Sequence, residues 1–242
     1  MGVPMVLLDV PYDNDDASVD YLADQLRELT RTLAKLTGVT FDENRLSDLL
    51  EVERETNALA WEFMRLQAEH FYPAEFIHHL FFVLAMQLSA GSKELRDLLR
   101  FMVDDIKRAP RLQGDKILWV HLMPYYQQSL KAAFDYSPTH QIVAVDMAFC
   151  TMSDLADADP FRALAKKLID NAMNGPYERK LALVDRLLDA THADGVIHFC
   201  HWGCKQSAGG SALLREHLHE AGVPLLQLDG DGIDERNSHD GQ

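Results

Sequence analysis

The stretch HFCHWGCKQSAGGS, residues 198–211, is the part of the sequence that decides the fold and the site. It follows an apolar run that begins at Gly195 and is typical of a short buried strand. It precedes an amphipathic helix predicted over residues 212–221. A loop that leads from a strand to a helix is where α/β domains usually bind ligands. This loop contains Cys200, Cys204, a lysine, two serines and paired glycines, and the N–H groups of the following helix favour a bound anion.

The rest of the second half of the chain alternates short apolar runs with helical patterns. Strands are predicted over 117–122, 142–146, 196–199 and 225–228, and helices over 127–134, 160–174, 177–191 and 212–221. This alternation is typical of a three-layer α/β domain with a parallel sheet. Ligands of open parallel sheets bind at the carboxyl ends of the strands. These ends carry Pro124-Tyr125-Tyr126, Cys150, Cys204 and the pair Asp229 and Asp231.

The first half of the chain is predicted to be mainly helical. Residues 3–10 form an apolar segment that resembles a buried strand, with no strand partner in this half. Capping residues and helical spacing predict four helices: from Asp15 or Asp16 to about 36, from Asp42 to about 70, over 74–88, and from Ser92 to about 107. The third is apolar on nearly all sides, which indicates burial or a subunit interface. Residues 108–115, RAPRLQGD, are the clearest linker, so we place a boundary between 1–110 and 111–242.

Composition excludes some classes of partner. The formal net charge of −15 argues against nucleic acid and against an anionic membrane surface. No apolar run approaches the roughly 20 residues of a membrane span, and no signal peptide is recognised at the amino terminus. Three cysteines are too few for a disulfide framework. We therefore expect a cytoplasmic protein with reduced thiols.

Two of the cysteines are candidate metal ligands. Cys150 and Cys204 are far apart in the sequence, yet both follow predicted strands and should lie on one rim of the sheet. Two thiolates in a reducing compartment favour a soft metal centre, and cysteine thiolates hold iron–sulfur clusters. The alternative is that both are small buried core residues. Cys200 is nearer the strand and is interpreted as core, and zinc is less favoured because its usual companion ligands are missing.

Polar residues in and near the loop could have a role in binding or catalysis, or only a structural role. His198 and His201 flank the cysteines and could donate hydrogen bonds to sulfide or to a substrate. Lys205 could pair with an anionic cluster or a phosphate, or be a solvated charge at a helix start. Asp229 and Asp231, with two glycines, could bind a cation or form a turn.

With these residues in view, the sequence resembles the 2-hydroxyacyl-CoA dehydratase family, which also contains the benzoyl-CoA reductase subunits. The resemblance covers nearly the whole chain. It includes the Pro-Tyr-Tyr segment at 124–126 and five blocks: VLLDVPYD at 6–13, DYLADQLRELTRTLAKLTG at 20–38, VDMAFC at 145–150, ADGVIHFCHWGCKQSAG at 193–209 and LLREHLHEAGVPLLQLDGDGIDERNSHDGQ at 213–242. The resemblance is strongest over the last two blocks.

The resemblance implies two Rossmann-like domains joined by helices, with a [4Fe–4S] cluster held between them by three cysteines. Cys150 and Cys204 correspond to two of these ligands, and the third belongs to an amino-terminal domain that is mostly absent here. Residues 1–110 are then the end of a first, truncated α/β domain with a helical linker region. Residues 111–242 are the second Rossmann-like domain, which carries the cluster cysteines. The chain looks like a partial subunit.

The resemblance also implies a hydro-lyase that removes water from an (R)-2-hydroxyacyl-CoA through a ketyl radical. An ATP-hydrolysing iron–sulfur activator supplies the electron, and a second homologous subunit completes a heterodimer. Around the cluster, His201, Lys205 and Ser207 are the candidate catalytic residues. The apolar helix with His78 and His79 is expected to line the acyl-CoA channel, although buried histidines are more often hydrogen-bonded core residues.

Two other functions stay open at this point. The chain could belong to an ATP-dependent benzoyl-CoA-type reductase, which screening of substrates would separate from a dehydratase. It could also be a non-catalytic partner subunit or fragment. Such a chain would fold but would bind no cluster and show no enzymatic turnover. The sequence names neither the acyl group nor the subunit of the pair.

Overall fold

A parallel sheet of four strands lies at the centre of the computed structural model, which describes residues 4–237. The strand order is β2-β1-β3-β4, and every neighbouring pair is parallel. The strands are β1 (Asp115–Val120), β2 (His140–Val145), β3 (Gly195–His201) and β4 (Leu225–Gly230). All four predicted strands are therefore confirmed, with ends that differ by a few residues.

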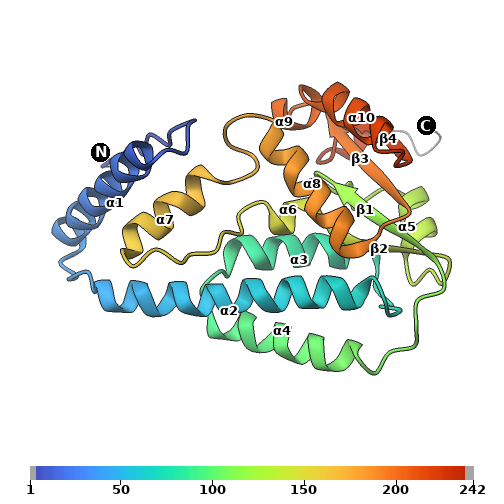
Figure 1. Cartoon of the computed structure of the whole chain (residues 1–242), viewed down its shortest axis with the longest axis horizontal. Coiled ribbons are helices and arrows are strands. Elements are labelled where there is room, and N and C mark those ends of the chain that lie inside the picture. Colours follow the sequence, from blue (N-terminus) through green and yellow to red (C-terminus); the bar gives the residue numbers. More distant parts are fainter. Residues whose placement is uncertain (1–3, 238–242) are drawn as a thin grey trace.

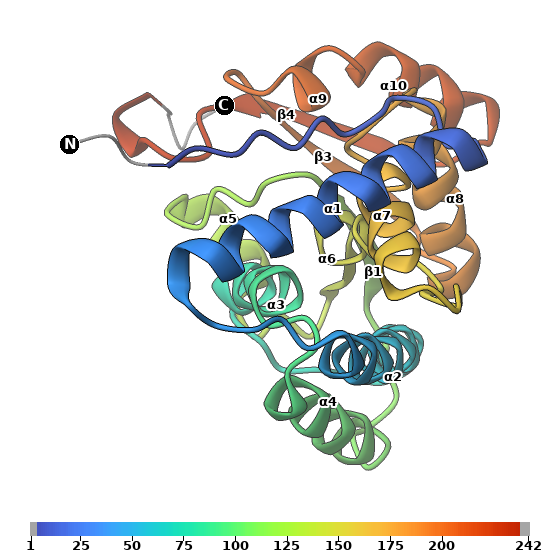
Figure 2. The same cartoon turned by 90° about the vertical axis from the view of Figure 1, so that its left-hand side faces the viewer.

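Helices cover both faces of the sheet, which confirms the predicted three-layer α/β fold. Figure 2 shows α3 and α5 on one side of the sheet and α8 with α10 on the other. Because both faces are covered, the strands are continuous apolar runs, and Leu118, Trp119 and Val120 of β1 are fully buried. The helices of this half are α5 (Gln128–Phe134), α6 (Asp146–Phe149), α7 (Pro160–Ile169), α8 (Glu178–Thr191), α9 (Lys205–Ala208) and α10 (Ser211–Glu220), followed by a short 3-10 turn, η1 (Glu235–Asn237).

The strand order locates the ligand-binding crevice of the sheet. The chain leaves β1 towards β2 on one side, and β3 and β4 then follow on the other side of β1. The order of strands thus reverses between β1 and β3. In open α/β sheets, ligands bind outside the carboxyl ends of the two strands at such a reversal.

The four helices predicted in the first half are confirmed, and their caps explain where they begin and end. Asp15 accepts from the Ser18 N–H at the start of the first helix, and Gly38, with a φ of 72°, ends it in the left-handed conformation. The helices are α1 (Asp16–Thr37), α2 (Glu43–Gln67), α3 (Phe76–Leu88) and α4 (Lys93–Ile106). Among the described residues, none of the helices is both long and apolar enough to cross a membrane.

The strand predicted over residues 3–10 is wrong for the part that the structure describes. Residues 4–10 are not in a strand, and Met5 and Leu7 are 91% and 83% exposed. A strand needs a neighbour for its backbone groups, and the described residues offer none beside this segment. Instead, the side chain of Gln25 on α1 hydrogen-bonds to both the N–H and the carbonyl of Asp9, at 2.9 and 3.0 Å. Val3 lies outside the described residues.

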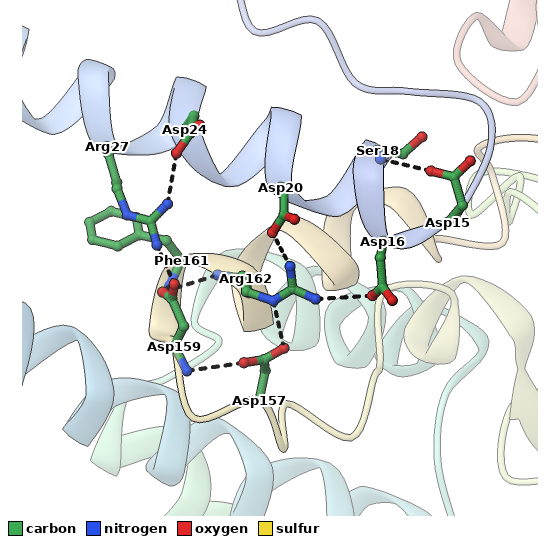
Figure 3. A network of polar contacts seen from close by, with 10 residues as sticks. All are labelled: Asp15, Asp16, Ser18, Asp20, Asp24, Arg27, Asp157, Asp159, Phe161 and Arg162. Carbon is green, nitrogen blue, oxygen red and sulfur yellow. Dashed lines mark hydrogen bonds and ion pairs between the residues drawn. The ribbon is translucent and has the colours of Figure 1, made fainter.

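The amino-terminal α1 packs on α7, which belongs to the second half of the chain (Figure 1). A small core of apolar side chains joins the two helices. Around it, Arg162 of α7 contacts Asp16 and Asp20 of α1 and also Asp157, as Figure 3 shows. Arg27 of α1 in turn contacts Asp159. The boundary near residue 110 stays a prediction, and the segments on its two sides pack against each other.

Replacing Arg162 with alanine is expected to loosen α1 from α7. The change removes one cation that three carboxylates share, and leaves Asp16, Asp20 and Asp157 to repel one another. We expect amide hydrogen exchange in α1 to become several-fold faster, while exchange in β1 stays unchanged. Arg31→Ala is the matched control, because within residues 4–237 Arg31 pairs only with Glu28 of the same helix. Equal exchange in the two variants would contradict the role of Arg162.

Candidate functional site

A cysteine and a histidine meet at the crevice between β1 and β3. His121 directly follows β1, and Cys204 follows β3 at the start of α9. The Cys204 Sγ and His121 Nε2 atoms are 3.3 Å apart, and Cys204 is half-buried. The structure thus places Cys204 at the rim, as predicted, and gives it a partner that the sequence analysis missed. The predicted strand over 117–122 has His121 near its carboxyl end, but only the strand order brings that strand next to β3.

His121 has an unusual backbone. Its φ is +77°, a left-handed conformation that residues other than glycine rarely adopt. Its N–H donates to Asp146 Oδ1 at 2.7 Å, and Asp146 is the first residue of α6, directly after β2. A strained backbone persists only where its surroundings hold it, and such residues gather at functional sites. The carboxylate of Asp146 is the group that holds His121.

The Asp146 carboxylate that contacts His121 also forms a buried ion pair. Lys180 of α8 and Asp146 are both fully buried, and Lys180 Nζ lies 3.2 Å from Asp146 Oδ2. A buried charge is costly unless an opposite charge compensates it, so each partner depends on the other. The Tyr177 hydroxyl and both ring nitrogens of His198 are also buried, without a hydrogen-bond partner among the described residues. We call the following five residues the rim cluster: His121, Asp146, Tyr177, Lys180 and His198.

The two histidines of the rim cluster are neutral near pH 7. Burial lowers the pKa of His121 to about 4, and the nearby Lys180 ammonium lowers it further than Asp146 raises it. Burial also lowers the pKa of His198 to about 4, again with a smaller contribution from Lys180. A neutral imidazole has one N–H donor and one acceptor nitrogen, so its role depends on which nitrogen carries the proton.

The low pKa values of these histidines predict a loss of stability in acid. A histidine in the unfolded chain binds its proton near pH 6.5, whereas His121 and His198 in the folded protein bind it only near pH 4. Their contribution is therefore fully present above pH 6.5 and is lost as the pH falls towards 4, by on the order of 3 kcal/mol for each residue. Urea unfolding across this range should show that slope, and His198→Phe should reduce it. An unchanged slope in the variant would contradict this account.

Cys150 lies on the same rim in a different setting. It ends α6, after β2, and β1 separates β2 from β3 by two strand spacings of about 4.8 Å each. Its thiol is buried and donates to the Met147 carbonyl at 3.3 Å, with Gln87 Nε2 3.9 Å from the sulfur. Burial, followed by the charge of Asp146, raises the pKa of the Cys150 thiol to about 12. The assignment of Cys150 as a ligand stays a prediction, and its thiol would have to leave this hydrogen bond to bind iron.

The described residues do not form a complete site for a [4Fe–4S] cluster. Residues 4–237 contain no group of three or more histidine, cysteine, aspartate or glutamate side chains placed to hold one metal ion. A cluster of this type needs three or four cysteine ligands. Cys204 offers one half-buried sulfur at the crevice, so the described residues in this conformation do not supply the full set of ligands.

The three candidate catalytic residues lie close together in the loop, but in different roles. The Ser207 hydroxyl is buried, accepts from the His201 N–H and donates to the Phe199 carbonyl, both at 3.0 Å, so it closes the loop on itself. The His201 ring accepts from the Gly232 N–H through Nδ1 at 3.0 Å. Lys205 is exposed on the first turn of α9, beside Cys204. Of the three, Lys205 is the one whose charged end reaches solvent at the rim.

Two further predictions concern Cys200 and the pair Asp229 and Asp231, of which Asp229 lies near the end of β4 and Asp231 follows it. Cys200 is buried, as expected of a core residue, and burial, followed by a hydrogen bond with Asp229, raises its pKa. Asp231 accepts from the N–H groups of Ile233 and Asp234, at 2.9 and 3.2 Å, and from the Asn237 side chain. These contacts form a turn, which favours the turn interpretation over a cation site.

His78 and His79 border an apolar cavity of about 390 Å³ between α2, α3, α4 and β2. Burial, followed by the charge of His78, lowers the pKa of His79 to about 4. The expectation that this helix lines an acyl-CoA channel stays a prediction. The cavity has mainly apolar walls, contributed by Phe63, Met64, Phe82, Leu99, Met102 and Phe149 among others.

Comparisons with known proteins point to one family. The family model described as 2-hydroxyglutaryl-CoA dehydratase, D-component, matches residues 1–242. The chain is 21% identical to the (R)-phenyllactyl-CoA dehydratase alpha subunit of Clostridium sporogenes, over 100% of this chain and 62% of that one. It is 22% identical to the (R)-2-hydroxyisocaproyl-CoA dehydratase alpha subunit of Clostridioides difficile, over 98% and 61%, and 22% identical to the (R)-2-hydroxyglutaryl-CoA dehydratase subunit alpha of Acidaminococcus fermentans, over 98% and 52%.

The match extends over the whole chain but not over the whole of these relatives. The chain spans between half and two thirds of the length of the three subunits. The family that the residues of the loop suggested is the family whose model fits all 242 positions. The chain therefore belongs to the 2-hydroxyglutaryl-CoA dehydratase, D-component, family.

Proposed function

We propose that this chain is part of a subunit of a 2-hydroxyacyl-CoA dehydratase, a hydro-lyase that removes water from an (R)-2-hydroxyacyl-CoA. The observation that carries the proposal is the placement of Cys204 beside His121 at the crevice between β1 and β3. The names of the three relatives support the reaction class, since each is a dehydratase of an (R)-2-hydroxyacyl-CoA. Because the chain spans only part of these relatives, the activity is proposed for the whole protein.

We propose a [4Fe–4S] cluster as the cofactor of the whole protein, with Cys204 as a ligand from this chain. When bound, the cluster would supply one-electron chemistry at the crevice. The chain's own contribution is to hold the Cys204 sulfur next to His121 and to present the Lys205 ammonium to an anionic group, such as a phosphate of coenzyme A. The other ligands would come from residues outside this chain or from Cys150 after a change of its thiol hydrogen bond.

The proposed reaction needs an electron because the hydrogen removed with the hydroxyl group is not acidic. An ATP-hydrolysing iron–sulfur activator would supply one electron to the thioester, and the resulting ketyl radical anion would expel hydroxide. The β-hydrogen of the radical that remains is acidic and would leave as a proton to a base, which completes the loss of water. The electron returns at the end, so the overall loss of water is redox-neutral. The proposed partners are this activator and a second, homologous subunit, a proposal that the alpha-subunit names of the relatives support.

The test uses anaerobically prepared protein that is extended by the amino-terminal part of a relative and mixed with a partner subunit, the activator and ATP. We expect bound iron and sulfide, and ATP-dependent dehydration of (R)-phenyllactyl-CoA, (R)-2-hydroxyisocaproyl-CoA or (R)-2-hydroxyglutaryl-CoA. Reduction of benzoyl-CoA without any dehydration would establish the reductase alternative. Folded protein without iron or turnover would establish a non-catalytic subunit.

A further inference from the structure

A chain of contacts runs through the rim cluster, from the buried Lys180 to the sulfur of the neighbouring Cys204. Lys180 Nζ lies 3.2 Å from Asp146 Oδ2, and Asp146 Oδ1 accepts the His121 N–H at 2.7 Å. The His121 Nε2 atom then lies 3.3 Å from the Cys204 sulfur. These four residues come from α8, α6, the end of β1 and the start of α9. Contacts that join four elements at one point fix the geometry there more tightly than any single element could.

The proton of the His121 ring can be assigned from its surroundings. The Nδ1 atom is buried and has no hydrogen-bond partner among the described residues. A buried N–H group without a partner is rarer in proteins than a buried acceptor without one. The neutral ring therefore carries its proton on Nε2, where the N–H points at sulfur. The other ionisable neighbours of the ring are Lys180, His198 and His201, and none of them is hydrogen-bonded to Nδ1.

We propose that Asp146 and Lys180 are positioning residues that hold His121 so that its Nε2–H donates a hydrogen bond to the Cys204 sulfur. The carboxylate keeps the His121 backbone in its left-handed conformation, with φ at +77°, and the ammonium keeps the carboxylate charged and in place. A hydrogen bond of this kind orients a sulfur that acts as a metal ligand. That Cys204 is a metal ligand rests on the proposed function, whereas the hydrogen bond does not.

The first test measures the ring proton in the chain of 242 residues, without any metal. A long-range ¹H–¹⁵N correlation spectrum reports which ring nitrogen is protonated, and His121→Gln assigns the signal. We expect a protonated Nε2 and an unprotonated Nδ1, and we expect Cys204→Ala to shift the Nε2 signal. A protonated Nδ1 in the parent chain, or a His121 signal that does not respond to Cys204→Ala, would overturn the proposal.

The second test compares two double variants that both remove the buried charges. Lys180→Met with Asp146→Asn keeps an oxygen that accepts the His121 N–H, whereas Lys180→Met with Asp146→Leu loses it. We expect the first to keep the Nε2 proton and the second to give a mixture of both ring forms, in samples whose melting curves show folded protein. The same His121 spectrum in both would reduce the hydrogen bond from His121 to residue 146 to a structural role and overturn the proposal. Iron content of the whole protein tests the proposed function separately, because these spectra require no cluster.

Discussion

Replacing Cys204 with alanine is expected to abolish iron binding and dehydration in the whole protein. The sulfur of Cys204 lies at the point where the strand order reverses, 3.3 Å from His121 Nε2, and it is the one of the two candidate sulfurs that is not buried. Loss of a residue that only supports a metal ligand typically lowers metal affinity by about 10–100-fold, and loss of the ligand itself should cost more. Iron and acid-labile sulfide per protein, measured after anaerobic purification, check this directly.

Cys150→Ala, measured beside it, tests whether Cys150 is a second ligand. The Cys150 thiol is 5% exposed and donates to a backbone carbonyl, and its pKa is raised to about 12 by burial, so it is a poor source of thiolate in this conformation. If Cys150 is a second ligand, as the sequence predicts, the variant loses iron as Cys204→Ala does. If Cys150 is only a core residue, the variant keeps its iron and loses on the order of 1 kcal/mol of stability through a small cavity. Iron loss in both variants would support both cysteines as ligands, whereas iron loss in Cys150→Ala alone would contradict the role of Cys204.

Much of the fold could be predicted from local patterns in the sequence. The four strands follow from apolar runs, and the helix starts follow from capping residues such as Asp15, Asp42 and Ser92, because caps act within a few residues. The strand prediction for residues 4–10 was wrong because a strand depends on distant residues. The apolar pattern is that of a strand, but a strand forms only beside a neighbouring strand, which no local pattern can supply. The short helices α6 and α9 were missed, since four residues leave too little periodicity to detect.

The site was predictable only in part, because its key contacts depend on strand order. Cys204 could be placed on the rim from its position after a strand. The pairing of Cys204 with His121 requires β1 beside β3, and the pairing of Lys180 with Asp146 requires α8 to pack over the start of α6. A lysine in an amphipathic helix is normally exposed to solvent, so nothing in the sequence around Lys180 indicates that it is fully buried.

Replacing Lys180 with methionine is expected to cause a large loss of stability. Methionine fills much of the space of the lysine stem, but it leaves the Asp146 carboxylate buried without its cation. Breaking one side of a buried ion pair typically costs about 3–5 kcal/mol, a large share of the roughly 5–15 kcal/mol that stabilises a domain. Urea unfolding of the chain, followed by circular dichroism, measures the difference.

The double variant Lys180→Met with Asp146→Asn separates the charge from the packing. It removes both buried charges and keeps an oxygen for the His121 N–H, so no unpaired ion remains in the interior. We therefore expect the double variant to be more stable than Lys180→Met alone, although it carries one more substitution. If the second substitution instead adds to the loss, the cost of Lys180→Met lies in packing around α8 and not in an uncompensated charge. Together with the single variant Asp146→Asn, these two proteins complete a double-mutant cycle, whose non-additivity measures the coupling between Lys180 and Asp146.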